Sequence, residues 1–437
     1  MREMKDSGIE WVGKVPATWK IMPNKYIMTK KKVIKEVYDG ENIISLSMNG
    51  VIIRDLEAGG KMPKTFDGYQ IVYPGNLLMC LFDYDVTPRC IGLIKDYGVT
   101  SPAYSQFVMN NGNYSGYYYY YYLMIDHTKA LLHLAKNLRH SLTEEQLGAI
   151  LAPVPTIEEQ QRIVDFLDFK CSKIDASAED IQKEISLLEE YKKSVITEAV
   201  TKGLNPDVEM KDSGIEWIGE IPKDWEFPKI THILDYTHPY PIGDGDHGTI
   251  KAENYSEEGI PFIRVQNLGF ATELIMNNVV YITEKQNNGI INSTLYPNDI
   301  LFAKTGATIG KVGIMPENIK KANTTSHVGK ITVSEEVVPK YIFYVLSSFI
   351  GYKQFWDIAL MKSTRPELSI DEIKTLHVLL PKTKEEQQQI VDYLDTKCSE
   401  IDSLIADKKR QLDILADYKK SLIYEYVTGK KEVPVNE

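Results

Sequence analysis

The chain has little cysteine and no long apolar run. Its 437 residues include four cysteines, at positions 80, 90, 171 and 398. This spacing does not fit a zinc finger or a zinc ribbon, so we expect free thiols in a reducing compartment. No segment approaches the roughly 18 apolar residues that a membrane span needs, and the start MREMKDSGIEW lacks the basic and apolar pattern of a signal peptide. We therefore expect a cytoplasmic protein without a membrane partner.

The sequence also lacks the common signatures of catalysis. The string GATIGK at 306–311 resembles a phosphate-binding loop, but three residues separate its glycines where four are needed, and Val312 follows its lysine in place of Ser or Thr. The string PDVEMK at 206–211 resembles a nuclease carboxylate cluster but lies in a linker. There is no nucleophile elbow, no HExxH motif and no Asn-Pro-Pro-aromatic string like that of amino-group DNA methyltransferases. We expect no catalytic residue, no metal site and no bound cofactor.

Several stretches of the sequence occur twice. The nonapeptide EMKDSGIEW stands at 3–11 and again at 209–217, and Gly-x-[Val/Ile]-Pro-x-x-Trp follows both copies. The string EEQQRIVD at 158–165 returns as EEQQQIVD at 385–392. The nonapeptide repeats after 206 residues and the later string after 227, so the segment between them is 21 residues longer in the second copy. These repeats indicate a duplicated architecture.

The repeats separate two variable blocks from constant parts. The blocks share little beyond YPGNLL at 73–78 and YPNDIL at 296–301. In each, short β-rich runs bounded by Gly, Pro and Asn precede helical patterns, at 117–134 and 341–360, which indicates an α+β domain twice over. The predicted segments are an opener (1–19), a first block (20–152), a helix (153–203), a linker with the second opener (204–225), a second block (226–380), a second helix (381–430) and a tail (431–437).

Both constant helical segments carry a stripe with a period of seven residues. Its positions are 174, 181, 188 and 195 in the first segment and 401, 408, 415 and 422 in the second, where Lys408 is the charged member. A continuous helix over 157–200 would be about 66 Å long at 1.5 Å per residue, and alone it would leave its stripe exposed. We expect the two helices to pair as a coiled coil. The alternative is that each helix packs only on its own domain.

Charge is unevenly distributed along the chain. The net charge of −11 argues against a nucleic-acid partner for the chain as a whole. The first block, however, has 14 Lys and Arg against 12 Asp and Glu, and the second has 14 against 17. The helices have 6 against 11 at 153–200 and 8 against 10 at 381–428. The acidic helices are therefore a less favourable DNA surface than the blocks.

In layout and wording the chain resembles the specificity subunit of a type I restriction-modification system. The resemblance rests on the opener, the Pro-x-x-Trp after it, and two copies of Glu-Glu-Gln-Gln leading into a helix that ends in Tyr-Lys-Lys-Ser. It implies two target recognition domains that each read one half of a bipartite site in double-stranded DNA. It implies an antiparallel coiled coil that sets the gap and docks two methyltransferase subunits, joined by restriction-translocase subunits, in a pseudo-twofold internal repeat. This chain would be non-catalytic, and its partners would use S-adenosylmethionine, ATP and Mg²⁺.

We expect DNA contacts on exposed loops of the two blocks, because base reading needs donors or acceptors and phosphate contacts need Lys, Arg, Ser or Thr. The alternative for each candidate is an ordinary exposed side chain, or a salt bridge for the two arginines that precede the helices. The candidates are Thr87, Arg89, Ser101 and Tyr104 in the first block, His247, Lys304, Thr305, Thr308, Lys311, Ser326 and His327 in the second, and Arg139 and Arg365 before the helices.

A second group of candidates concerns partner binding and the ends of the coil. If the helices run antiparallel, the end of the second helix lies near the start of the chain and the two openers occupy pseudo-equivalent places. Trp11 and Trp217 are the expected anchors of the openers. The candidates for contact with partners on the helices are Tyr191, Lys192, Tyr418 and Lys419.

The six consecutive tyrosines at 117–122 allow two interpretations. They could stack on bases, but the bases of duplex DNA are already stacked, so burial is favoured. Two other functions also stay open at this point. One is a self-sufficient DNA methyltransferase or nuclease, and the other is a tandem protein-interaction scaffold built on a coiled coil.

Overall fold

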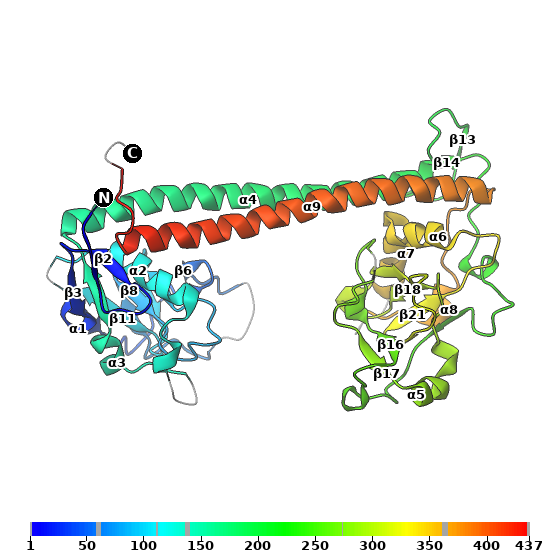
Figure 1. The fold of residues 1–437 in the computed structure, drawn as a ribbon. Coiled ribbons are helices and arrows are strands. Elements are labelled where there is room, and N and C mark those ends of the chain that lie inside the picture. Colours follow the sequence, from blue (N-terminus) through cyan, green and yellow to red (C-terminus); the bar gives the residue numbers. More distant parts are fainter. Residues whose placement is uncertain are drawn as a thin grey trace. The chain divides into compact units, whose positions relative to one another are not determined.

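The structure is a computed structural model that describes residues 2–57, 63–110, 112–135, 140–272, 274–360 and 366–434 (Figure 1). It divides into two compact units, Met1–Gln182 with Lys409–Glu437, and Lys183–Lys408. Both divisions fall inside the long helices α4 (Ile157–Lys202) and α9 (Lys384–Val427). Each unit therefore contains one opener, one variable block and a part of both long helices.

The first variable block combines short strands with the helices α1, α2 and α3. Its four-stranded antiparallel sheet has the order β4-β11-β8-β9, and two-stranded sheets β5-β6, β10-β7 and β12-β3 surround it. The elements of the first unit up to α4 are β1 (Met4–Asp6), β2 (Lys14–Pro16), β3 (Lys20–Pro23), α1 (Asn24–Ile27), β4 (Met28–Lys31), β5 (Ile44–Ser47), β6 (Gly50–Ile53), β7 (Gln70–Val72), β8 (Leu77–Met79), β9 (Ile91–Leu93), β10 (Gly98–Thr100), β11 (Ser105–Met109), α2 (Ser115–Thr128), η1 (Leu132–Leu134), α3 (Glu144–Ala149) and β12 (Leu151–Val154).

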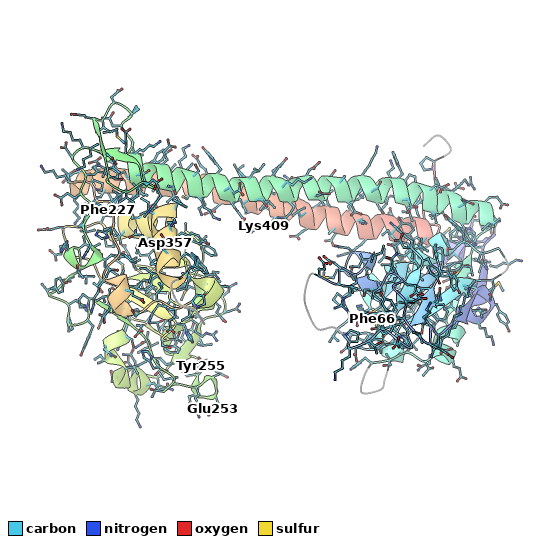
Figure 2. All side chains as sticks on the ribbon, turned by 180° about the vertical axis from the view of Figure 1, so that it is seen from behind. Phe66, Phe227, Glu253, Tyr255, Asp357 and Lys409 are labelled. Carbon is cyan, nitrogen blue, oxygen red and sulfur yellow. The ribbon has the colours of Figure 1, made fainter. Side chains whose placement is uncertain are left out.

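The second variable block has a sheet of the same design, β15-β21-β18-β19, and a second sheet β17-β16-β20. The ring centroid of Tyr255, which is labelled in Figure 2, lies 6.0 Å from that of Phe262 in β16 of this second sheet. The elements are β13 (Met210–Asp212), β14 (Glu220–Pro222), η2 (Ile230–His232), β15 (Ile242–Asp244), η3 (Ala252–Asn254), β16 (Ile260–Ile263), η4 (Val265–Asn267), β17 (Val280–Ile282), α5 (Glu284–Gly289), η5 (Ile291–Ser293), β18 (Ile300–Ala303), η6 (Gly306–Thr308), β19 (Val312–Ile314), β20 (Asn323–Thr324), β21 (Val328–Ile331), α6 (Pro339–Ser347), α7 (Phe349–Leu360) and α8 (Ile370–Ile373).

The shared YPGNLL and YPNDIL strings occupy the same place in the two sheets. Each string leads into the strand that pairs on both sides within its four-stranded sheet, β8 in the first block and β18 in the second. The turn before the strand needs a residue with positive φ, which is Gly75 (φ 84°) in one block and Asn298 (φ 69°) in the other. Glycine and asparagine are the residues that adopt this conformation most readily. The two blocks thus contain four-stranded sheets of the same design, although their sequences differ.

The two long helices begin and end in the same way. Thr156 and Thr383 cap them, each hydroxyl accepting the backbone N–H three residues on, at 3.3 and 3.2 Å. Both are followed by a glycine with positive φ, Gly203 at 71° and Gly429 at 68°, where the chain leaves the helix. Both helices lie inside the segments that were expected to be helical, 153–203 and 381–430.

In each unit the helices pack antiparallel. In the first unit Phe166 near the start of α4 packs on Tyr426 near the end of α9, with ring centroids 4.4 Å apart. Two ion pairs related by the 227-residue repeat fix the register: Lys419 donates to Asp175 in the first unit (2.6 Å), and Lys192 donates to Asp402 in the second (2.7 Å). Lys408, the charged member of the stripe, pairs with Glu184. Pairing of the two helices, expected from the stripe, is present in both units.

The two openers form the same hairpin. β1 pairs with β2 in the first copy and β13 with β14 in the second. In each turn an aspartate accepts a backbone N–H two residues on, from Gly8 to Asp6 and from Gly214 to Asp212, both at 2.9 Å. Arg2 donates to Glu159 at 2.5 Å and to Glu432 at 2.6 Å, so the end of α9 lies near the start of the chain, as the antiparallel arrangement predicts.

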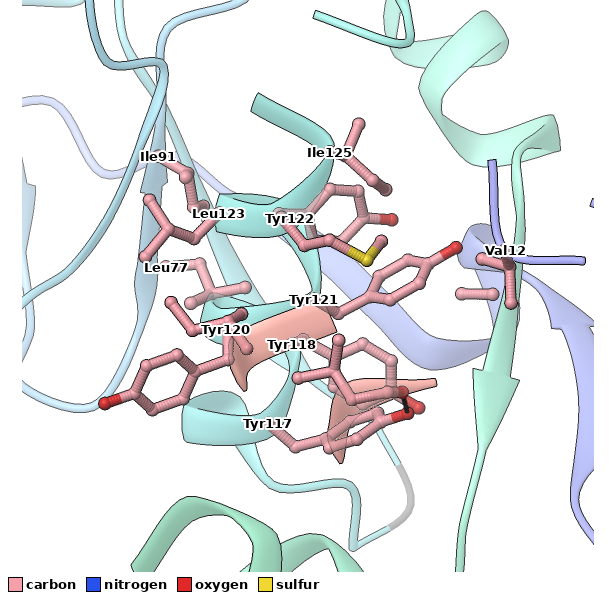
Figure 3. Close-up of a cluster of buried hydrophobic side chains, with 14 of the residues drawn as sticks. Val12, Leu77, Ile91, Tyr117, Tyr118, Tyr120, Tyr121, Tyr122, Leu123 and Ile125 are labelled. Atoms are coloured by element: carbon pink, nitrogen blue, oxygen red, sulfur yellow. Dashed lines mark hydrogen bonds between the residues drawn. The ribbon is translucent and has the colours of Figure 1, made fainter. Parts of the chain in front are cut away.

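The six tyrosines lie on α2, and five of them, Tyr117, Tyr118, Tyr120, Tyr121 and Tyr122, are buried in the first core (Figure 3). Tyr119 is half-buried. Tyr117 donates to Val427 O at 2.7 Å and Tyr121 to Leu151 O at 3.2 Å, whereas the Tyr122 hydroxyl has no hydrogen-bond partner among the described residues. Burial raises their pKa values well above the ordinary value, so they stay neutral donors. The expected burial is confirmed.

Each block is attached to its long helix by a tryptophan. The indole of Trp19 donates to Glu159 at 2.8 Å, and that of Trp225 donates to Glu386 at 3.0 Å. Both tryptophans are 1% exposed, whereas Trp11 and Trp217 of the openers are half-buried. Sequence reasoning chose the opener tryptophans and passed over Trp19 and Trp225, although the Pro-x-x-Trp string marked them. None of the described helices is apolar over a length that would cross a membrane.

The Trp225 contact predicts a measurable loss of stability. Trp225→Phe removes a hydrogen bond to a carboxylate and leaves an aromatic ring in place, so the free energy of unfolding should fall by about 1.5–3 kcal/mol. Trp356→Phe in the same unit is the matched control, because the Trp356 indole N–H is buried without a hydrogen-bond partner among the described residues. Urea unfolding monitored by circular dichroism should show the larger loss for Trp225→Phe, and equal losses would contradict the anchoring role.

Candidate nucleic-acid interface

Two loop strings of the first block meet at an aromatic contact. Phe82 and Tyr104 stack with ring centroids 6.3 Å apart, which joins the Asp83–Cys90 loop to the Ser101–Tyr104 turn. Gln70 holds that turn, because its amide donates to Ser101 O at 2.9 Å and to Tyr104 O at 2.7 Å. Burial raises the pKa of Tyr104. The structure therefore brings together candidates that are more than ten residues apart in the sequence.

Arg89 is held by three hydrogen bonds. Its guanidinium donates to Ile91 O at 3.1 Å, to Met48 O at 3.0 Å and to the Tyr119 hydroxyl at 2.6 Å. These bonds tie the β5–β6 turn to β9 and α2, so Arg89 shapes the surface around it. Its role as a base contact stays a prediction.

Three strings of the second block converge on one polar cluster. Lys304 forms a buried ion pair with Asp244, and His247 lies 3.1 Å from the other oxygen of the same carboxylate. The backbone N–H of Lys304 donates to His327 O at 2.9 Å, and the Thr305 hydroxyl lies 3.3 Å from His327 Nδ1. His247 and His327 are exposed. The cluster thus presents the imidazoles of His247 and His327 to solvent, and the Lys304–Asp244 ion pair beneath them fixes its position.

Asp246 shapes the His247 turn and was missed by sequence reasoning. Its buried carboxylate accepts three backbone N–H groups, from Gly248 at 3.1 Å, Thr249 at 3.0 Å and Ile250 at 2.9 Å. The Asp-x-Gly spacing is a turn signal that would have identified it. The Asp246 carbonyl accepts the N–H of Ser326 at 2.9 Å, which attaches the 325–327 turn to the same cluster.

Thr308 and Lys311 lie on the next turn. The Thr308 hydroxyl donates to Thr305 O at 2.6 Å, so it closes the η6 turn. Lys311 Nζ lies 5.9 Å from the centroid of the exposed Phe270 ring. These two residues are therefore beside the cluster. Their contact with DNA stays a prediction.

The remaining candidates are two arginines and possible metal ligands. Arg139 and Arg365 lie outside the described residues. Across the ranges that the structure describes, no group of three or more His, Cys, Asp or Glu is placed to hold a metal ion. The four cysteines are free thiols and are buried.

The helix candidates form one exposed patch in each unit. Tyr191 and Tyr418 are 57% and 54% exposed, and the residues one turn before them, Leu187 and Ile414, are 64% and 61% exposed. Leu187 and Ile414 are related by the same 227-residue repeat as the tyrosines, so the repeat could have identified them. The adjacent Lys192 and Lys419 make the register ion pairs described above. Each unit thus has one exposed pair of an aliphatic residue and a tyrosine, Leu187 with Tyr191 and Ile414 with Tyr418.

Comparisons with known proteins agree with the repeated strings. Residues 222–413 match the family described as "Type I restriction modification DNA specificity domain". The chain is 28% identical over 288 residues to the type I restriction enzyme MjaVIII specificity subunit of Methanocaldococcus jannaschii, over 65% of this chain and 63% of that protein. It is 26% identical over 273 residues to the type I restriction enzyme EcoBI specificity subunit of Escherichia coli, over 60% of this chain and 54% of that protein.

The matched region spans somewhat more than half the length of these relatives. A chain in the solved structure described as "Structural basis underlying complex assembly and conformational transition of the type I R-M system" has the same fold, with a TM-score of 0.68 at 14% identity, over 95% of this chain and 99% of that chain. Residues 222–413 are therefore similar to a type I restriction-modification DNA specificity domain, and these two relatives are specificity subunits of type I restriction enzymes. The resemblance stated from the repeats is confirmed, as is the mixed helix and strand content.

The Lys304–Asp244 pair allows a test of what Lys304 does. The Asp244 side chain is 17% exposed, so leaving it unpaired should cost less than the about 3–5 kcal/mol of a fully buried charge. Lys304→Met should therefore lower the free energy of unfolding by about 1–3 kcal/mol, and adding Asp244→Asn should restore part of the loss. Lys311→Met is the control and should change stability little. Urea unfolding measures all three; unchanged stability of Lys304→Met with weakened DNA binding would identify Lys304 as a phosphate contact instead.

Proposed function

We propose that this chain is the sequence-specific DNA-recognition subunit of a type I restriction-modification complex. Its blocks at 20–152 and 226–380 act as target recognition domains, and each reads one half of a bipartite site in double-stranded DNA. The observation that carries the proposal is that both domains are attached to the long helices by the same set of contacts, although their loops differ. The same contacts hold both domains to the long helices, while the loops that would face DNA differ completely.

The duplicated attachment has three contacts in each unit. The first is the indole bond of Trp19 or Trp225, described above. In the second, Gln160 accepts the N–H of Tyr114 at 2.8 Å, and its counterpart Gln387 accepts that of Val338 at 2.9 Å. In the third, a domain tyrosine donates to a helix aspartate at 2.6 Å: Tyr120 to Asp168 and Tyr344 to Asp395. A shared scaffold that presents two different surfaces suits a protein that reads two different half-sites.

The long helices provide the partner surface in this proposal. Two identical methyltransferase subunits dock on the two exposed patches, and restriction-translocase subunits join that core in the cytoplasm. The paired helices act as a rigid spacer, so the two domains meet half-sites only at a fixed gap on the duplex. The chain itself is non-catalytic, and the partners use S-adenosylmethionine, ATP and Mg²⁺.

Methylation assays separate this function from its alternatives. The purified chain is mixed with DNA and radiolabelled S-adenosylmethionine, alone and with its partner methyltransferase. We expect adenine methylation only with the partner, at sites with two defined halves, and its loss when the gap is lengthened by one base pair. Methylation by the chain alone would support a self-sufficient methyltransferase. Methylation by the partner without dependence on sequence would support a protein scaffold.

The two exposed patches predict how many partners bind. Tyr191→Arg and Tyr418→Arg each place a charge in one patch, so each single variant should bind one methyltransferase and the double variant none. Tyr236→Arg, at a 70% exposed tyrosine of the second block, is the matched control and should bind two. Native mass spectrometry counts the subunits, and a double variant that still binds two partners would place the docking surface elsewhere.

A further inference from the structure

Backbone strain in the first unit is concentrated around the Asp83–Cys90 loop. Among the described residues, non-glycine residues with positive φ include Asp83 at 46°, Lys129 at 51° and His140 at 41°. All three contact this loop or belong to it: Tyr84 N donates to His140 O at 3.2 Å, and Lys129 Nζ donates to Thr87 O at 2.7 Å. Such conformations persist only where surrounding contacts enforce them, and they cluster at functional sites.

A buried ion pair fixes the far end of the loop. Asp126, at the end of α2, is buried and accepts the N–H of Cys90 at 2.8 Å. Its other oxygen accepts from Lys129 Nζ at 2.7 Å. Lys129 Nζ also lies 4.8 Å from the centroid of the Tyr84 ring. Burial lowers the pKa of Lys129, but the hydrogen bonds and charges of Asp126 and Cys90 together outweigh burial and raise the pKa, so the ammonium stays charged.

The near end of the loop closes on itself. The carbonyl of Asp83 accepts the N–H groups of Val86 at 3.2 Å and Thr87 at 2.9 Å, which makes one tight turn. The side chain at the apex of that turn is Val86, which is 73% exposed. Valine is usually buried, and here a rigid backbone holds it in solvent. Lys129 and Arg89 beside it are occupied by their own hydrogen bonds, and Asp85 and Pro88 of the loop are also exposed, so Val86 is the branched aliphatic group that the loop presents to solvent.

We propose that Lys129 and Asp126 clamp the Asp83–Cys90 loop as a rigid reading element, and that Val86 at its apex contacts a thymine methyl group in the half-site of the first domain. This inference rests on the proposed function. An aliphatic side chain that enters the major groove has one apolar partner on the base edges, the C5-methyl of thymine. The clamp contributes by avoiding the entropy cost of ordering the loop when DNA binds. Lys129 and Asp126 are positioning residues, and Val86 is the specificity contact.

The test uses the full chain with its partner methyltransferase. Sequencing of methylated sites first defines the two half-sites, and competition binding then measures discrimination against a mismatch in each half. Lys129→Met should reduce discrimination in the first half about tenfold, within the effect of one mismatched base pair, and leave the second half unchanged. Lys129→Arg keeps the ion pair and should retain discrimination.

A thymine-to-deoxyuridine exchange tests the apex contact. It removes only the methyl group, so wild-type affinity should fall about fivefold at one thymine of the first half-site, in the range expected for one lost base contact. Val86→Ala should bind both duplexes equally. Val37→Ala is the matched control, because Val37 is a 69% exposed valine of the same block, and it should keep the wild-type penalty. Val86 packs on little, so its variant should fold normally even if Lys129→Met does not.

The outcomes distinguish the two levels of the argument. If the wild-type complex shows no sequence preference, the proposed function is wrong and this inference falls with it. If the wild-type complex reads both halves but Lys129→Met discriminates equally well, the clamp is wrong. If Val86→Ala keeps the deoxyuridine penalty, or no thymine in the first half-site carries one, the apex contact is wrong.

Discussion

The hydrogen bond from a buried indole to a glutamate at the start of a long helix is the contact on which the rest of each unit depends. Trp19 and Trp225 occupy this position, and their acceptors Glu159 and Glu386 lie in the first turn of α4 and α9. A carboxylate is favourable there because the helix N-terminus carries partial positive charge. The indole therefore finds a fixed acceptor, and the opener that leads to it is fixed with it.

This attachment has two consequences for the domain surfaces. The attached surface is constrained, because the tryptophan and the domain tyrosine must each meet a carboxylate of the helix and one backbone N–H of the domain must meet the helix glutamine. The loops at Asp83–Cys90 and around Asp244 carry no such constraint, so they can differ between the units. In the proposed function, base recognition could then change by substitution in the loops without disturbing the paired helices.

Particular elements show how far the sequence could be interpreted. The seven-residue stripe predicted the two long helices, because this signal is local and regular. The YPGNLL and YPNDIL strings were noted only as common wording of the two blocks, and the structure places both at the turn before an inner strand of a four-stranded sheet, where a left-handed residue is required. The Trp11 and Trp217 choice passed over the buried anchors, because an indole's burial depends on what packs over it and the repeat marks all four tryptophans alike.

The sequence by itself determined the duplication, the two long helices and the resemblance to type I specificity subunits, since each follows from strings that occur twice in the sequence. The tertiary structure decided which polar groups meet. Lys304 and Asp244 are 60 residues apart, and Lys129 reaches Thr87 across 42 residues. Neither spacing has a periodic signature, because these contacts are made by loops whose paths are set by the sheets beneath them. The candidate reading surfaces are therefore properties of the folded domains.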